Sequence, residues 1–112
     1  MHDLKVLITW EAIYDITGIA EYIEELSGDE RADLFQQEIY DEIEKLQYQA
    51  SIFGKTSLLY RSYHIQKKLF RPSIIFYIID EQDNSVHVLR VLREEMDWEL
   101  RLSGNQKYTY PD

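Results

Sequence analysis

The chain has 112 residues, of which 45% are hydrophobic and 29% are charged, and it contains no cysteine. This length fits a single domain with its own hydrophobic core, and the lack of cysteine excludes disulfides, thiolate metal sites and a cysteine nucleophile. The formal net charge of −9 taken alone disfavours a nucleic-acid-binding protein.

Two further properties bear on cellular location. No apolar run approaches the roughly 20 residues that cross a bilayer. The first ten residues include Asp3 and lack the basic start and small-residue cleavage site of a signal peptide. We therefore expect a cytoplasmic protein that does not associate with membranes.

The charge is unevenly distributed along the chain. Residues 11–45 contain twelve acidic and two basic residues, a balance of −10. Residues 46–93 contain seven basic and three acidic residues, a balance of +4. One interpretation is a solvated acidic helical face with scattered basic strand residues, and the other is a segregated surface that selects its partners.

The N-terminal part predicts a strand followed by a helical hairpin. Leu4–Thr9 is a short β-prone run, and Thr9 then stands where a helix N-cap is expected. Apolar residues recur at helical spacing after it: Ala12, Ile13, Ile16, Ile19, Ala20, Ile23 and Leu26. Ser27–Asp29 interrupts this helix, with Ser27 and Glu30 as a possible capping box for the next one.

The second predicted helix runs to about Gln49. Its apolar stripe consists of Phe35, Ile39, Ile43 and Leu46. Two amphipathic helices joined by three or four residues predict an antiparallel hairpin.

The remaining segments predict three strands and a short helix. Leu58–Ile65 is strand-prone after a loop at residues 50–57, and Gln66-Lys67-Lys68 reads as a basic connection. Ile74–Ile79 is nearly continuous apolar sequence, with pairing expected from Ser73 because Pro72 cannot donate a ladder hydrogen bond. The final elements follow in order: a loop at residues 80–85, a strand at 86–92 and a helix at 94–102.

These elements give the order β-α-α-β-β-β(-α) and an α+β fold, in which the helical hairpin packs on one face of a small, mainly antiparallel sheet. We expect one domain over residues 1–102. Residues 103–112 form a polar tail that we expect to be mobile.

The chain carries none of the common catalytic motifs: it has no Gly-rich phosphate loop, no HExxH and no GxSxG. His64 and His87 lie on different predicted strands. We therefore expect no metal site and no cofactor.

The basic residues of the second half are the best candidates for binding a target or a phosphate. They come from three strands and their connections, so they can converge on one side of the sheet: Arg61, Lys67, Lys68, Arg71, Arg90 and Arg93. Guanidinium groups bind phosphates or carboxylates bidentately. Arg90 and Arg93 can equally hold the terminal helix through its acidic residues.

An RNA-cleaving site would also need a general base, a general acid and cations around the phosphate. The available candidates are Lys55, Lys67, Lys68, His64, His87 and the tyrosines. No spacing singles out a pair, so the catalytic residues stay unassigned, and direct nucleic-acid binding is left open.

The chain resembles the RelE/ParE superfamily of bacterial toxins over nearly all of residues 4–102. The resemblance begins with Trp10-Glu11-Ala12 and continues through Phe53-Gly54, Tyr60-Arg61-Ser62 and the apolar run 75–78. Its most specific part is the segment 88–97, VLRVLREEMD. That segment is similar to the ParE-type ending, although Arg93 stands where a histidine is usual and Glu95 where an arginine is usual.

The resemblance implies the toxin of a type II toxin–antitoxin (plasmid stabilisation) system, with a small cognate antitoxin as its partner. The ParE-like branch implies a non-enzymatic inhibitor of growth that binds DNA gyrase. The alternatives are a ribosome-dependent mRNA endoribonuclease of RelE type and a decayed, non-toxic binding module, for which the altered residues 93 and 95 argue.

Overall fold

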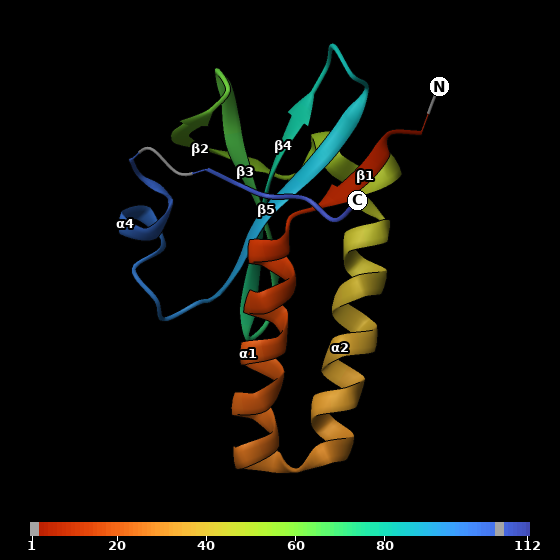
Figure 1. Ribbon diagram of the computed structural model, residues 1–112, viewed down its shortest axis with the longest axis vertical. Coiled ribbons are helices and arrows are strands. Elements are labelled where there is room, and N and C mark those ends of the chain that lie inside the picture. The colour runs from red at the N-terminus through yellow and green to blue at the C-terminus, as the bar shows by residue number, and fades with distance from the viewer. Residues whose placement is uncertain (1–2, 105–106) are drawn as a thin grey trace.

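A computed structural model describes residues 3–104 and 107–112. Its elements, in chain order, are β1 (Lys5–Ile8), α1 (Trp10–Ser27), α2 (Asp29–Glu44), α3 (Leu46–Gln49), the 3₁₀ helix η1 (Ala50–Ile52), β2 (Gly54–Tyr60), β3 (Tyr63–Phe70), β4 (Ser73–Asp80), β5 (Ser85–Arg93) and α4 (Trp98–Leu102). The strands form one sheet in the order β1-β5-β4-β3-β2. Among the described strands only β1 and β5 pair in parallel, so the α+β class and the mainly antiparallel sheet are confirmed (Figure 1).

The start of α1 is fixed by Thr9, as the sequence predicts. The Thr9 hydroxyl accepts a hydrogen bond from the Ala12 amide at 2.9 Å, which satisfies one of the unpaired donors of the first helical turn. The same hydroxyl donates to the Leu89 carbonyl of β5 at 2.8 Å. One side chain therefore caps the helix and joins it to the central sheet.

Gly28 joins the two long helices, and the predicted capping box is wrong. α1 continues to Ser27, and Gly28 is both the C-cap of α1 and the N-cap of α2, with no side-chain cap. Its φ of 91° lies in the left-handed region that glycine adopts without strain. A backbone turn at glycine thus replaces the expected capping by Ser27 and Glu30.

Both faces of the central strands are covered. Ile75 and Tyr77 of β4 pack with the buried residues of α1 and α2, and this confirms the helical hairpin on one face of the sheet. Ile74, Phe76 and Ile78 face the other way, because side chains alternate along a strand. This second core is completed by the C-terminal part of the chain, with contributions from Trp98, Leu102 and Tyr108.

The expectation of one strand at residues 58–65 is wrong. The chain turns at Arg61 and Ser62, whose φ values are 52° and 72°, so the run is divided between β2 and β3. Two consecutive left-handed residues make a tight hairpin turn. This turn contains no glycine or asparagine, the residues by which such a turn is recognised in a sequence. Residues 66–68 are consequently part of strand β3 and not a connection.

The helix expected at residues 94–102 is shorter. Residues 94–97 form a turn, and α4 begins only after Asp97, whose carboxylate accepts from the Leu100 amide at 3.4 Å. The Glu94 amide donates to the Pro72 carbonyl at 2.9 Å, which holds this turn beside the β3–β4 connection.

The end of the chain returns to the start of α1. The Trp10 amide donates to the Thr109 carbonyl at 2.8 Å, and the Thr109 amide donates to the Glu11 carboxylate at 2.9 Å. Tyr108 packs edge-on against Tyr60 with ring centroids 5.0 Å apart. The mobility of residues 103–112 stays a prediction. The contacts of residues 108–110 are the positions at which it can be tested.

None of the helices within the described residues is long and apolar enough to cross a membrane.

Candidate functional site

The six basic candidate residues lie at several places on the fold. Lys67 and Lys68 point to opposite faces of the sheet because they are neighbours on β3. Arg61 lies in the β2–β3 turn and Arg71 in the β3–β4 turn. Arg90 and Arg93 line a common groove.

Lys68 is a buried structural residue, 4% exposed. Its ammonium group donates to the Glu42 carbonyl at 2.8 Å and to the Gln49 amide oxygen at 3.1 Å. It also lies 3.1 Å from the Glu42 carboxylate. These acceptors compensate for the burial of the charge, and the group ties β3 to α2 and α3.

Three other candidates have partners on the surface. The Lys67 ammonium lies 5.0 Å from the centre of the Trp98 ring, and the Arg61 guanidinium lies 5.3 Å from that of Tyr60. Both distances are within the range of cation–π attraction. Arg71 forms an exposed ion pair with Glu94 at 3.4 Å, which contributes little to stability because water screens it.

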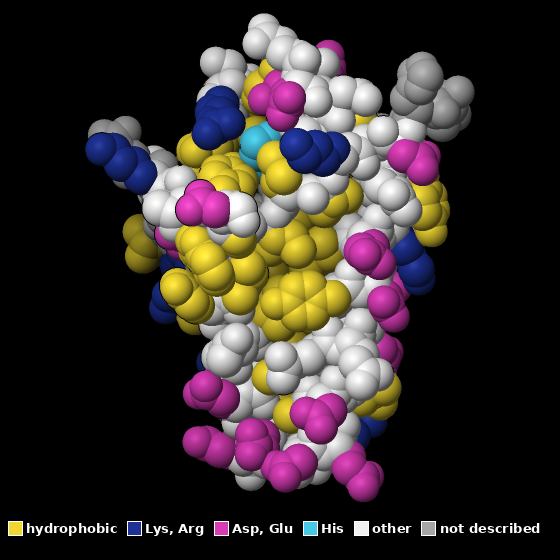
Figure 2. Space-filling view, turned by 45° about the vertical axis from the view of Figure 1, so that its right-hand side comes forward, with side chains coloured by type: hydrophobic (Ala, Val, Ile, Leu, Met, Phe, Trp, Pro, Cys, Tyr) yellow, Lys and Arg dark blue, Asp and Glu magenta, His cyan; other side chains and the backbone are white. Residues whose placement is uncertain are grey.

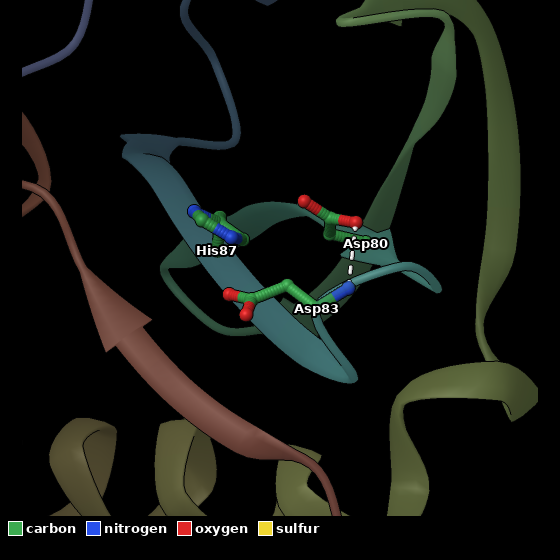
Figure 3. A group of neighbouring side chains, drawn as sticks. All are labelled: Asp80, Asp83 and His87. Carbon is green, nitrogen blue, oxygen red and sulfur yellow. Dashed lines mark hydrogen bonds between the residues drawn. The ribbon is translucent and has the colours of Figure 1, made fainter.

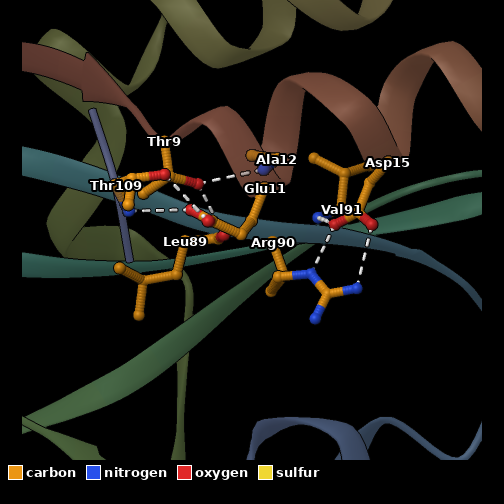
Figure 4. Close-up of polar contacts among 8 residues, drawn as sticks. All are labelled: Thr9, Glu11, Ala12, Asp15, Leu89, Arg90, Val91 and Thr109. Atoms are coloured by element: carbon orange, nitrogen blue, oxygen red, sulfur yellow. Dashed lines mark hydrogen bonds and ion pairs between the residues drawn. The ribbon is translucent and has the colours of Figure 1, made fainter. Parts of the chain in front are cut away.

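Arg90 forms a bidentate ion pair with Asp15 of α1 (Figure 4). Its Nε and Nη2 donate to the two carboxylate oxygens at 2.6 and 2.9 Å, and the Val91 amide donates to one of them at 3.0 Å. The hydrogen bonds that Arg90 donates to Asp15 raise the pKa of Arg90, and this effect outweighs the opposing effect of burial. The structural role expected for Arg90 was to hold the terminal helix. In the structure it holds α1 instead.

Arg93 lies at the edge of the same region, against an aromatic ring. Its guanidinium is 4.2 Å from the centre of the Tyr22 ring and 3.1 Å from the exposed carboxylate of Glu95. The planar guanidinium stacks well on aromatic faces. Arg93 therefore presents its charge beside an apolar surface of α1.

These residues border a groove of about 280 Å³ between α1 and the chain that follows β5. We call it the α1 groove and define it by Tyr14, Gly18 and Tyr22 on one side and Arg93, Met96 and Arg101 on the other. Arg90, with its Asp15 partner, lies between the two sides. The lining contains three arginines and one aspartate, so it is positive on a protein whose net charge is −9.

Acidic side chains are concentrated elsewhere. Figure 2 shows them crowded over the helical hairpin in the lower part of the view, whereas hydrophobic side chains gather in the middle of that face. The acidic helical face that the sequence indicates is therefore present in space, whereas the basic candidates are dispersed. It leaves the α1 groove as a locally basic surface.

His87 lies close to Asp80 and Asp83 at the β4–β5 turn (Figure 3). Its Nε2 is 2.9 Å from the Ser85 hydroxyl and its Nδ1 is 2.7 Å from the Tyr110 hydroxyl. Asp80 accepts hydrogen bonds from the amides of residues 82 and 83. A metal ion would have to displace a hydrogen bond of His87, because both of its ring nitrogens have partners, and the arrangement is explained as a capped turn joined to the tail.

Sequence reasoning missed the aromatic side of the α1 groove. Trp10, Tyr14, Gly18 and Tyr22 recur every four residues, a spacing that places them on one face of a helix. This signal was available, but the stronger apolar stripe of α1 masked it. A Cβ added at Gly18 would meet no neighbouring element within 4 Å, so this glycine is not required for close packing.

The comparisons with known proteins agree with this architecture. Residues 6–98 match the family described as "ParE toxin of type II toxin-antitoxin system, parDE". The solved structure "Chromosomal ParDE TA system from P. aeruginosa" is similar in fold, with a TM-score of 0.69 and 22% sequence identity over 85% of this chain and 100% of that chain. No curated protein matches the sequence.

Proposed function

Since this chain belongs to the ParE toxin family of the RelE/ParE superfamily, and is thus a toxin of a type II toxin–antitoxin system, we propose that it inhibits growth by binding DNA gyrase. We further propose that a cognate antitoxin neutralises it by binding directly. The family match covers residues 6–98 and so includes the helical hairpin and all of the sheet except the first residue of β1.

One observation favours a binding protein over an mRNA nuclease. Each of the six basic candidates already contacts a carboxylate or an aromatic ring of the chain: Arg61, Lys67, Lys68, Arg71, Arg90 and Arg93. Cleavage of RNA would need several cations and a general acid or base directed at one phosphate. The dispersed positions of these residues support inhibition by protein binding.

Induced expression in a bacterial host tests the target. We expect growth arrest with a change in plasmid supercoiling, measured on chloroquine gels, while total mRNA stays intact on northern blots. Transcripts cut at normal supercoiling would instead identify a ribosome-dependent nuclease. Normal growth with folded toxin present would identify a non-toxic module.

A second experiment tests the partner. The antitoxin that we expect to be encoded in a small reading frame beside the gene is co-expressed with the toxin, and growth is compared with that of cells expressing either protein alone. We expect growth to recover and the two proteins to elute together in size-exclusion chromatography. Continued growth arrest, with the two proteins eluting separately, would contradict neutralisation by direct binding.

A further inference from the structure

A polar pocket lies at the end of the sheet that the two long helices leave uncovered. Figure 1 shows that the β2–β3 and β4–β5 turns extend beyond α1 and α2. The pocket has a volume of about 260 Å³ and shares no residue with the α1 groove. We call it the hairpin pocket and define it by Ser51, Lys55, Ser62, His64, Gln66 and Glu81.

Several polar groups of this pocket have no partner inside the protein. The six basic candidates each contact a carboxylate or an aromatic ring, whereas the Lys55 ammonium forms no hydrogen bond or ion pair with the described residues. The same is true of the Glu81 carboxylate and of the Ser51 and Ser62 hydroxyls. Water satisfies such groups at any surface, so the floor of the pocket has to show whether a ligand is recognised.

Gln66 supplies a hydrogen-bond acceptor from the floor. Its side-chain nitrogen donates to the carbonyls of Ala50 and Phe53 at 3.1 and 2.9 Å, which fixes the orientation of the amide because a carbonyl can only accept. Oε1 has no partner among the described residues, although Gln66 is only 3% exposed. No fully buried side-chain oxygen of those residues lacks a partner, so this oxygen opens into the pocket.

His64 supplies a second acceptor. Its Nδ1 lies 2.9 Å from the Thr56 carbonyl, so Nδ1 carries the proton and donates to that oxygen. Nε2 of the neutral ring is then an acceptor, and no described residue bonds to it. His64 and Gln66 are two residues apart on β3, and so they lie on the same face of the sheet.

The two unpaired charges lie on opposite sides of these acceptors. Lys55 is on β2 and Glu81 follows β4, and β3 lies between these two strands. With the Glu81 carboxylate, the pocket offers three acceptor groups to one ligand. An ammonium group has three donors and no acceptor, so it matches this set, and Lys55 supplies the charge for an anionic group beside it.

From these observations we propose that the hairpin pocket binds a small zwitterion of the α-amino acid class. Gln66, His64 and Glu81 accept hydrogen bonds from its ammonium group, and Lys55 pairs with its carboxylate. The volume of the pocket is slightly below the roughly 300–1,000 Å³ of sites for drug-sized molecules, which suits a ligand of this size. The proposal requires neither gyrase nor the antitoxin.

Binding is tested on the purified full-length protein. Each proteinogenic L-amino acid is added at about 10 mM, and the unfolding temperature is measured, because a ligand that binds the folded state raises it. The best ligand is then titrated into ¹⁵N-labelled protein. We expect at least one amino acid to raise the unfolding temperature and to shift the amide signals of the six residues that define the pocket.

Two derivatives of the best ligand test the zwitterion. N-acetylation removes its positive charge, and conversion of the carboxylate to a carboxamide removes its negative charge. We expect each derivative to raise the Kd about tenfold or more, because each loses a charge-assisted hydrogen bond. Equal binding of either derivative would overturn the assignment of the ligand class.

Two pairs of variants test the site. Lys55→Gln and Glu81→Gln remove its two charges without disturbing a contact within the chain, and each should raise the Kd about tenfold. The matched controls are Lys67→Gln, on the other face of β3, and Glu30→Gln, on α2. Both controls should leave the Kd within about twofold of the wild-type value.

Three results would overturn the proposal. They are the absence of binding by every amino acid, an unchanged Kd in both folded pocket variants, and amide shifts confined to residues outside the pocket. A failure of the proposed function is seen separately, since growth inhibition and supercoiling are measured without this ligand. Binding of the amino acid by a protein that does not arrest growth would support the pocket and contradict only the proposed function.

Discussion

Arg90 and Asp15 lie 75 positions apart in the chain, yet they form a bidentate ion pair that joins the interior strand β5 to helix α1. Their side chains are 18% and 15% exposed. The Val91 amide shares the same carboxylate. The pair therefore fixes the position of the helix that carries the exposed aromatic residues Trp10, Tyr14 and Tyr22.

Replacing Asp15 with alanine should destabilise the protein strongly. The change leaves the Arg90 guanidinium mostly buried without its counter-charge, and we expect a loss of about 3 kcal/mol in the free energy of unfolding. Urea denaturation followed by circular dichroism measures it. Asp15→Asn retains an acceptor and should lose less, and equal stability of the Ala variant and the wild type would contradict the structural role of the pair.

Lys68 should contribute to stability and not to toxicity. Lys68→Ala removes three contacts of a buried ammonium group with Glu42 and Gln49, and we expect a loss of about 2 kcal/mol in the free energy of unfolding. The matched control is Lys67→Ala, which removes the exposed neighbour on the other face of β3 and should cost less. Growth inhibition per folded molecule should be unchanged by Lys68→Ala, and a fall beyond the loss of folded protein would place Lys68 at the target interface.

Shortening the chain after Gly104 should weaken the domain without unfolding it. This removes the hydrogen bonds of Thr109 with Trp10 and Glu11 and the packing of Tyr108 on Tyr60. We expect a loss of about 2 kcal/mol, measured by thermal unfolding. Hydrogen exchange of the Trp10 amide in the full-length protein gives an independent measurement, because rapid exchange there would support a mobile tail.

The buried ring of His87 should make stability depend on pH. Burial, reinforced by the positive charge of Arg61, lowers the pKa of His87 even though Asp80 and Asp83 act in the opposite direction. The folded protein therefore binds a proton less readily than the unfolded chain. The resulting stabilisation is complete above the unfolded pKa of about 6.5 and is lost as the pH falls through the folded value.

As the pH falls from about 7.5 to about 5.5, we expect His87→Gln to lose less stability than the wild type. This window brackets the unfolded pKa. Urea denaturation at each pH measures the free energy of unfolding. His64→Gln is the matched control, because His64 is exposed on β3. Parallel pH profiles for the wild type and His87→Gln would show that the buried ring has no such role.

The elements that could be predicted from sequence are those set by local patterns. The apolar residues of α1 and α2 recur at helical spacing, and Thr9 has the side chain that a helix start needs. β4 and β5 are apolar runs on either side of a polar turn. The turn at Arg61 and Ser62 could not be predicted, because the left-handed conformation there depends on the pairing of β2 with β3.

The family resemblance was also available from sequence, because it rests on short residue patterns such as the segment 88–97, and the match over residues 6–98 confirms it. The arrangement of the basic residues was not. Lys67 and Lys68 are adjacent in sequence, but strand alternation separates them to the two faces of the sheet. Arg90 and Arg93 look alike in sequence, but one is neutralised by Asp15 and the other stacks on Tyr22.

The sequence by itself thus determined the secondary structure of the long elements, the fold class and the family, because periodicity and capping act over a few residues. Only the tertiary structure decided which charges are paired, which aromatic residues remain exposed and where the α1 groove lies. Those properties depend on contacts between residues such as Asp15 and Arg90, which the strand order brings together from distant parts of the chain.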